Sequence, residues 1–247
     1  ELIIPMMTMD GLADYSRNGG YVQGGVTMTN ETVKCNFDRG RRFDVDVMDD
    51  LETAGLAFGR LSAQFIRDKV VPELDAFRFA SYCGISGVTK KEETLADGAA
   101  TVAALSAAVT AMDDEEVTAT GRYLFITPTL LQGINDMDTT KSKKVLEGFE
   151  QVIKVPQRRF YTAIKQLSGK TGEEAGGYTK AAGAANINFA IVQKDALIQY
   201  TKHAAPKIIA PENNPDADAY VFGYRMVGIA KAYKNMLSGM YFSHDKA

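Results

Sequence analysis

The first fifth of the chain, residues 2–48, has a β pattern, in which apolar and polar residues alternate at residues 26–29, 33–37 and 42–47. This period of two is typical of β-strands that have one covered face and one solvated face. Asn18-Gly19 interrupts the pattern, and both residues readily adopt the positive φ angles that a tight hairpin turn needs. We therefore predict an extended hairpin that projects into solvent, with its tip at residues 17–20.

The stretch FDRGRRFDVDVMDDLE, residues 37–52, combines the same alternation with many charges. A strand would place Phe43, Val45 and Val47 on one side, where they cover apolar structure. The charged residues would form the other side: Arg42, Asp44 and Asp46. We interpret this stretch as a strand with a polar face.

From residue 49 the spacing of apolar residues becomes helical. They recur at helical spacing, at Leu51, Ala54, Phe58, Leu61, Phe65, Val70, Leu74 and Phe77. The acidic residues of this segment stand where they complement a helix N-terminus, at Asp49, Asp50 and Glu52. The pattern predicts a helix over residues 49–82, which Pro72 should kink or divide.

The rest of the chain mixes the two periods, so the order of elements predicts an α+β fold. An Ala-rich helix follows the sequence CGISG, and Thr127 with Pro128 marks the start of another helix. A short helix should begin at Asp195. Residues 168–185, rich in Gly, Ala, Lys and Thr, are predicted to form a long exposed loop. Further strands are predicted at residues 123–126, 151–155 and 189–192 and within residues 219–244.

The composition mainly excludes certain classes of protein. The chain has 45% hydrophobic and 24% charged residues, which is typical of a globular protein with a sizeable core. Its net charge of −3 and pI of about 5.5 lack the basic character of a broad nucleic-acid or membrane-surface binder. Cys35 and Cys83 are far apart and form no zinc-type pair, which favours a reducing compartment. No apolar run approaches the ~18 residues of a membrane span, so we expect no membrane association.

Two motifs suggest ligand chemistry, and each lacks a required residue. SGKTG, residues 168–172, ends like a phosphate-binding loop, but Ile164 stands where the first glycine should be. DVDVMDD resembles the start of a calcium loop, yet Asp49 and Gly55 replace the glycine and the glutamate of its sixth and twelfth positions. We therefore predict no metal and no cofactor.

Catalytic groups are equally sparse. The only histidines, His203 and His244, lie outside any recognised local motif for a nucleophile. The cluster of Arg39, Arg41 and Arg42 could bind phosphate, but it lies beside aspartates and is locally near neutral. Ion pairs across a protein interface suit such a cluster better.

Taken in order, several segments resemble the major capsid proteins of tailed bacteriophages, which share the HK97-like fold. The resemblance covers nearly the whole chain and is weakest over residues 168–185. It rests on the segments DYSRNGGY, DRGRRFDVDVMDDLET, RDKVVPELDAFRFASY, RYLFITPTLL, FAIVQKDALIQYTKHAAPKIIAPENNPDADAYVFGYR and YKNMLSGMYFSH.

The resemblance implies a shell protein without a catalytic site, built from an extended hairpin called the E-loop, a long spine helix and a mixed α/β axial domain. The family carries an N-terminal arm before the E-loop, and this chain begins at Glu1, so we expect a preceding segment. The implied division is an E-loop and β arm at residues 1–48, a peripheral domain at 49–95, an axial domain at 96–205 and returning strands of the peripheral domain at 206–247.

Implied partners are other copies of the chain, in pentamers and hexamers of an icosahedral shell. A scaffolding protein, a portal and a maturation protease are further expected partners, and DNA would be contacted only non-specifically. Such a protein assembles in the bacterial cytoplasm and resides in the virion capsid. The residues expected at subunit interfaces are Tyr15, Arg17, Arg39, Arg41, Arg42, Asp44, Asp46 and Glu52.

Two alternatives remain open. An encapsulin-like compartment would use the same fold to enclose protein cargo. An α/β hydrolase or nucleotide-dependent enzyme would need a pocket with convergent polar groups. The long hairpin and long helix disfavour this second alternative.

Overall fold

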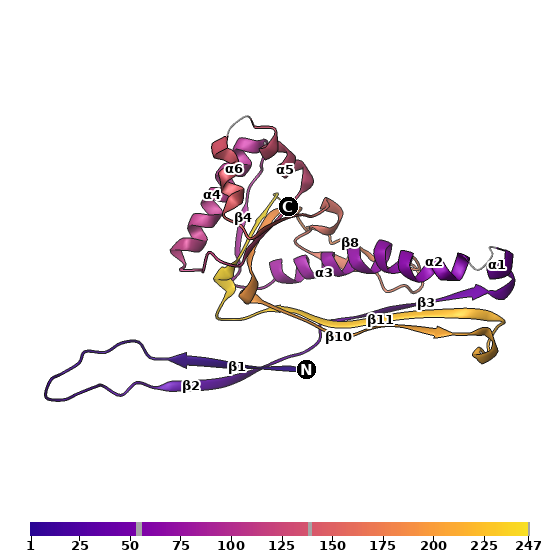
Figure 1. Cartoon of the computed structure of the whole chain (residues 1–247), viewed down its shortest axis with the longest axis horizontal. Helices are drawn as coiled ribbons and strands as arrows, with labels where there is room; N and C mark the ends of the chain where they lie inside the picture. The colour runs from indigo at the N-terminus through magenta and orange to yellow at the C-terminus, as the bar shows by residue number, and fades with distance from the viewer. Residues whose placement is uncertain (53–55, 138–139, 247) are drawn as a thin grey trace.

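The computed structural model describes residues 1–52, 56–137 and 140–246 of the chain. Figure 1 shows three parts: a hairpin arm, a long β-ribbon with helices along it, and a sheet with helices on one side. The arm and the ribbon extend in opposite directions, so the molecule is elongated (Figure 1).

The arm is the predicted hairpin. Its strands β1 (Leu2–Met9) and β2 (Val26–Val33) pair antiparallel along their whole length. The strands end at the pair Met9 and Val26, and an isolated bridge between Ser16 and Gly20 closes the tip. Gly20 has φ +73°, a conformation that favours glycine. The prediction of an extended hairpin with this tip is therefore confirmed. The predicted tight turn at Asn18-Gly19 is wrong, because neither residue has a positive φ and the paired strands already end at Met9 and Val26.

The ribbon is a three-stranded antiparallel sheet in the order β10-β11-β3. Its strands are β3 (Phe37–Asp46), β10 (Leu197–Ile209) and β11 (Ala219–Ala232). The short helix predicted from Asp195 is wrong. Only a single 3-10 turn, η3 (Lys194–Ala196), occurs there, because β10 begins at once and pairs with β11 over nearly its whole length.

The predicted spine helix lies along one face of this ribbon (Figure 1). Its described segments are α1 (Val47–Glu52), α2 (Leu56–Phe65), the π-helical η1 (Ile66–Val70) and α3 (Val71–Cys83). The predicted residue Ala54 lies outside the described residues. Pro72 stands in the first turn of α3, directly after the π segment. Because proline donates no hydrogen bond and crowds the preceding turn, the predicted interruption takes this π-helical form.

A five-stranded mixed sheet, ordered β4-β12-β9-β5-β6, forms the second half of the molecule. Its central strand β9 is buried at every position, including the polar residues Asn188 and Gln193 beside its apolar run at 189–192. Two clusters of buried side chains cover its two sides, with Phe160 and Phe242 in one and Leu124 and Phe189 in the other. The strands are β4 (Thr89–Glu92), β5 (Arg122–Ile126), β6 (Gln151–Lys154), β9 (Ile187–Gln193) and β12 (Met240–His244).

The Ala-rich helix predicted after CGISG is confirmed as one of the helices that pack on this sheet. Thr127 has an extended backbone and precedes Pro128, as predicted for the start of a helix, although its side chain makes no capping bond. The last strand, β12, pairs within the five-stranded sheet and not within the ribbon. The division of the chain into four parts, given above, remains a prediction. The helices are α4 (Gly98–Asp114), α5 (Pro128–Asn135) and α6 (Thr140–Glu147).

The predicted loop of residues 168–185 contains one more strand. β8 (Tyr178–Lys180) pairs antiparallel with β7 (Ile164–Gln166), which leaves a shorter loop between them. The prediction of an uninterrupted loop is thus wrong. Its pairing partner lies outside the Gly-rich segment, so composition alone did not indicate it.

Candidate subunit-interaction surface

The hairpin arm exposes an unusual amount of apolar surface. Nine of the 15 large apolar side chains that are exposed in the described part of the chain lie on it. A two-stranded hairpin alone buries little apolar surface. Contiguous apolar surface that stays exposed marks a site of interaction with other molecules. The nine are Ile3, Met7, Met9, Leu12, Tyr15, Tyr21, Val22, Val26 and Met28.

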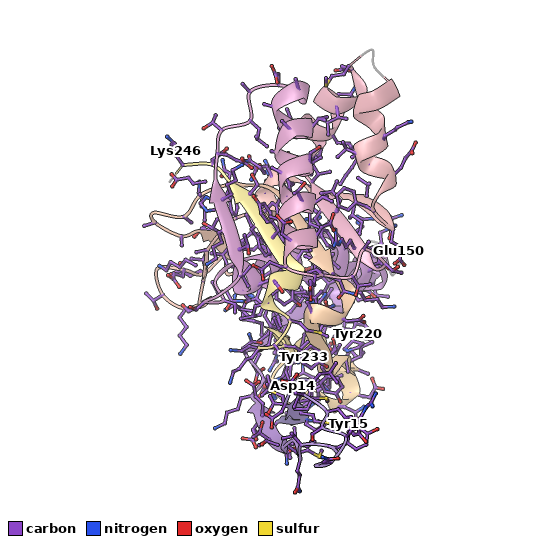
Figure 2. The ribbon with its side chains drawn as sticks, turned by 90° about the vertical axis from the view of Figure 1, so that its left-hand side faces the viewer. Asp14, Tyr15, Glu150, Tyr220, Tyr233 and Lys246 are labelled. Carbon is purple, nitrogen blue, oxygen red and sulfur yellow. The ribbon has the colours of Figure 1, made fainter. Side chains whose placement is uncertain are left out.

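The tip of the arm presents a pair of aromatic rings. The ring centroids of Tyr15 and Tyr21 lie 5.0 Å apart, and the Gly19 amide donates to Ser16 Oγ at 3.0 Å. Figure 2 looks at the molecule from the side on which the arm projects, and Asp14 and Tyr15 stand at its lower front. Arg17 is exposed and has no ion-pair partner among the described residues. The tip is therefore available to another molecule.

The base of the arm is anchored to the ribbon. Ile4 and Val33 form a buried cluster with Ile198 of β10 and Ile229 of β11. Asn36 exchanges two 2.9 Å hydrogen bonds with the backbone of Ala230, so its side chain substitutes for a paired strand residue. These contacts fix the direction in which the arm leaves the ribbon.

The outer face of β3 carries paired charges. Arg225 donates to both carboxylate oxygens of Asp38 at 2.8 and 2.6 Å, and this hydrogen bonding lowers the pKa of Asp38. Arg42 donates to Asp44 at 2.9 Å, which raises the pKa of Arg42. The predicted alternation of polar and covered positions along β3 is therefore confirmed.

Two further predicted interface residues lie where the ribbon ends. Asp46 accepts a 2.8 Å hydrogen bond from the amide of Met48 in the first turn of α1. Glu52 is exposed at the end of the same helix. Their role between subunits remains a prediction, as it does for Tyr15 and Arg17.

Arg39 and Arg41 point to the other side of β3 and bond within the chain. Arg39 donates to Glu73 of α3 at 2.8 Å and to the carbonyl oxygens of Leu167 and Gly177 at 2.7 and 3.2 Å. Arg41 donates to the carbonyl of Glu174 at 2.8 Å. Sequence reasoning missed Glu73 and the loop as partners, because contacts across 34 residues for Glu73 and more than 100 for the loop leave no local pattern. Both arginines tie the loop between β7 and β8 to the ribbon.

This loop contains SGKTG, and its structure does not suit phosphate. A phosphate-binding loop offers several free amides, but here carboxylates already accept from them. Glu173 accepts from the Ser168 amide at 2.7 Å, and Glu174 accepts from the Gly172 amide at 2.8 Å. The loop is thus closed by its own side chains.

Glu173 should report on this closure through its titration. The ion pair with Lys165, 2.6 Å long, and the Ser168 amide lower the pKa of Glu173 to about 2 from its usual 4.5. A lowered carboxyl pKa stabilises the folded loop above pH 4.5, and this stabilisation is lost as the pH falls towards 2. We expect carboxyl-carbon NMR to show a midpoint near 2.

The Lys165→Ala variant should raise the Glu173 midpoint, because it removes the larger cause of the shift. Lys170→Ala is the matched control, since this exposed lysine of the same loop has no ion pair with Glu173. A wild-type midpoint at 4.5 would contradict the described closure.

The described residues offer little other chemistry. No group of three or more His, Cys, Asp and Glu side chains within them could hold a metal ion. Cys35 and Cys83 are both free, and burial raises the pKa of the Cys83 thiol, which disfavours the reactive thiolate. In the same part of the chain, no helix has the length and hydrophobicity to cross a membrane.

Comparisons with known proteins identify the fold. No family model and no curated protein matches the sequence. Among solved structures, one from Gordonia phage Cozz has a TM-score of 0.64 and 10% identity, over 99% of this chain and 81% of that one. The capsid structure of the cyanophage P-SCSP1u gives 0.62 and 12%, over 100% and 84%. A structure from Mycobacterium phage Che8 gives 0.61 and 9%, over 98% and 84%.

These similarities cover essentially the whole chain, so they include the hairpin arm, the ribbon with its long helix and the five-stranded sheet. The chain has the α+β, HK97-like capsid fold.

Proposed function

We propose that the protein is a structural major capsid protein, which assembles with copies of itself into a closed shell around phage DNA. The single observation that carries this proposal is the apolar, projecting hairpin arm on a fold that matches phage capsid structures along its length. Many identical weak contacts in closed rings produce a strong shell. On this proposal the role is geometric and requires no catalysis.

The proposal includes the expected partners. A scaffolding protein, a portal and a maturation protease would act during assembly in the bacterial cytoplasm. The finished protein would reside in the virion, where DNA touches it without sequence specificity. Neither a cofactor nor a membrane is part of the proposal.

The decisive experiment is expression of the full-length protein together with its neighbouring genes. We expect closed particles or hexameric rings in negative-stain electron microscopy, and a matching large species in light scattering. A persistent compact monomer under all conditions would overturn the proposal. Particles that contain protein cargo and no nucleic acid would indicate an encapsulin-like compartment instead.

A further inference from the structure

A large groove lies between the spine helix, β3 and the β7–β8 hairpin. Its volume is about 1310 Å³. This exceeds the ~300–1,000 Å³ of ordinary small-molecule sites, so the groove suits a segment of polypeptide. Apolar side chains such as Leu61, Phe65 and Pro156 form part of its lining.

The groove is cationic although the whole chain is acidic. Seven cationic and three anionic residues line it, whereas the chain has a net charge of −3. The cationic residues are Arg39, Arg41, Arg67, Lys69, Arg158, Arg159 and Lys180, and the anionic ones are Asp38, Asp68 and Glu73.

The carboxylates of all three anionic residues are already paired, that of Asp38 on the outer face of β3. Arg225 pairs with Asp38, Arg67 with Asp68 and Arg39 with Glu73, at 2.6 to 2.8 Å. Several of the cationic residues that line the groove therefore have no salt bridge among the described residues.

Lys69 and Arg158 are exposed and form no salt bridge with a carboxylate in the described residues. Lys180 donates to the amide oxygen of Asn186 at 3.0 Å, lies over the ring of Tyr161 and has no salt bridge within the part of the chain that the structure describes. The groove thus offers open positive charge on an apolar lining, which favours an anionic polypeptide.

A matching acidic segment lies at the far end of the ribbon. The turn between β10 and β11 includes η4 (Pro211–Asn213) and reads PENNPDAD, with three carboxylates and no Lys or Arg. Glu212, Asp216 and Asp218 are exposed. Figure 1 shows this turn at the same end of the ribbon as α1, with the ribbon between the two. We call these residues, 211–218, the acidic tip.

The acidic tip is placed away from the groove of its own chain. Asp216 lies 3.9 Å from Arg42, on the outer face of β3. Arg41 and Phe43 line the groove, and the alternation of a strand puts them on the opposite face from Arg42. The ribbon pairs β3, β11 and β10 continuously up to the turn, so the tip cannot fold back. Only a second copy can bring an acidic tip to this groove.

We propose that the acidic tip of one copy binds in the cationic groove of a neighbouring copy. The inference rests on the proposed shell function, because it names one contact by which copies join. Charge complementarity fixes the register of such a contact and excludes wrong partners. The contact is heterologous, since a tip meets a groove, so its repetition generates rings or extended lattices.

Cross-linking of the assembled wild-type protein tests the contact directly. A carbodiimide joins lysine amines to carboxylates that touch them, and mixed isotope labelling distinguishes links between copies from links within one. We expect links between copies that join Lys69 or Lys180 to Glu212, Asp216 or Asp218. Particles whose tip carboxylates link only to other lysines would overturn this inference and leave the shell function intact. A protein that forms no particles at all would overturn the shell function first.

Charge reversal provides a second readout. Lys69→Glu with Arg158→Glu, and separately Glu212→Lys with Asp218→Lys, should each lower particle yield by about tenfold or more, because like charges then meet. Combining all four changes should restore most of the yield. The control, Asp114→Lys with Glu115→Lys, reverses two exposed charges on another part of the surface and should have little effect. Normal assembly of the groove variant with loss only of packaged nucleic acid would overturn the inference and assign the groove to nucleic acid.

Discussion

Shortening the hairpin arm should abolish assembly while the subunit stays folded. Replacing residues 10–25 by Asn-Gly would join Met9 and Val26, the last pair of the β1–β2 ladder, with a two-residue turn. The change removes the exposed tip, including Tyr15 and Tyr21, but leaves the buried base of the arm in place. We expect no particles in electron microscopy and a melting temperature within about 5 °C of the wild type, because surface changes alter stability little.

The size of the assembly defect follows from repetition. A buried tyrosine at the centre of an interface contributes ~2 kcal/mol or more, and each copy of a shell would lose two such anchors. Point variants separate this effect from the shape of the arm. Tyr15→Ala with Tyr21→Ala should also prevent assembly, whereas Thr27→Ala with Thr29→Ala, exposed polar positions on the same arm, should assemble normally. Normal shells from the shortened arm would show that the arm is not an assembly contact.

Elements with a strong local signal could be predicted from the sequence. The hairpin follows from the alternation in its second strand and from the turn-forming residues around Gly20, and the spine helix follows from its repeating apolar positions. The buried middle of strand β9 follows from the apolar run at residues 189–192. In each case the residues that determine the structure lie within one element, so the pattern is visible without knowledge of the fold.

Elements that depend on distant partners could not be predicted. β10 is exposed on both faces over most of its length, so it lacks an alternating pattern, and its pairing with β11 decides its conformation. Among the candidate site residues, the pairing of Arg42 with Asp44 follows from their spacing on one face. The contacts of Arg39 and Arg41 with the β7–β8 loop depend on tertiary structure and had no local signal.

We expect the largest loss of subunit stability from Gly98→Ala, which adds a single methyl group at the contact between α4 and α5. A Cβ at Gly98 would lie 2.2 Å from the carbonyl oxygen of Gly133 and 2.6 Å from its carbonyl carbon. Both atoms belong to the backbone, so neither can move without displacing α5. Overpacking of this kind typically costs 1–3 kcal/mol, and we expect Gly98→Ala to reach about 3 kcal/mol because no side chain can yield.

Gly133→Ala is the matched control, since its Cβ would meet the backbone of Gly98 only at 3.4 Å. Neither glycine has a positive φ, so space alone distinguishes the two substitutions. In a helix, alanine is favoured over glycine by up to ~1 kcal/mol, and this gain should offset the small contact strain at Gly133. Urea denaturation of the unassembled subunit should therefore show a large loss for Gly98→Ala and a change below about 1 kcal/mol for Gly133→Ala. An equally small change for Gly98→Ala would contradict the prediction, and it would mean that α4 and α5 can separate at this contact with little loss of stability.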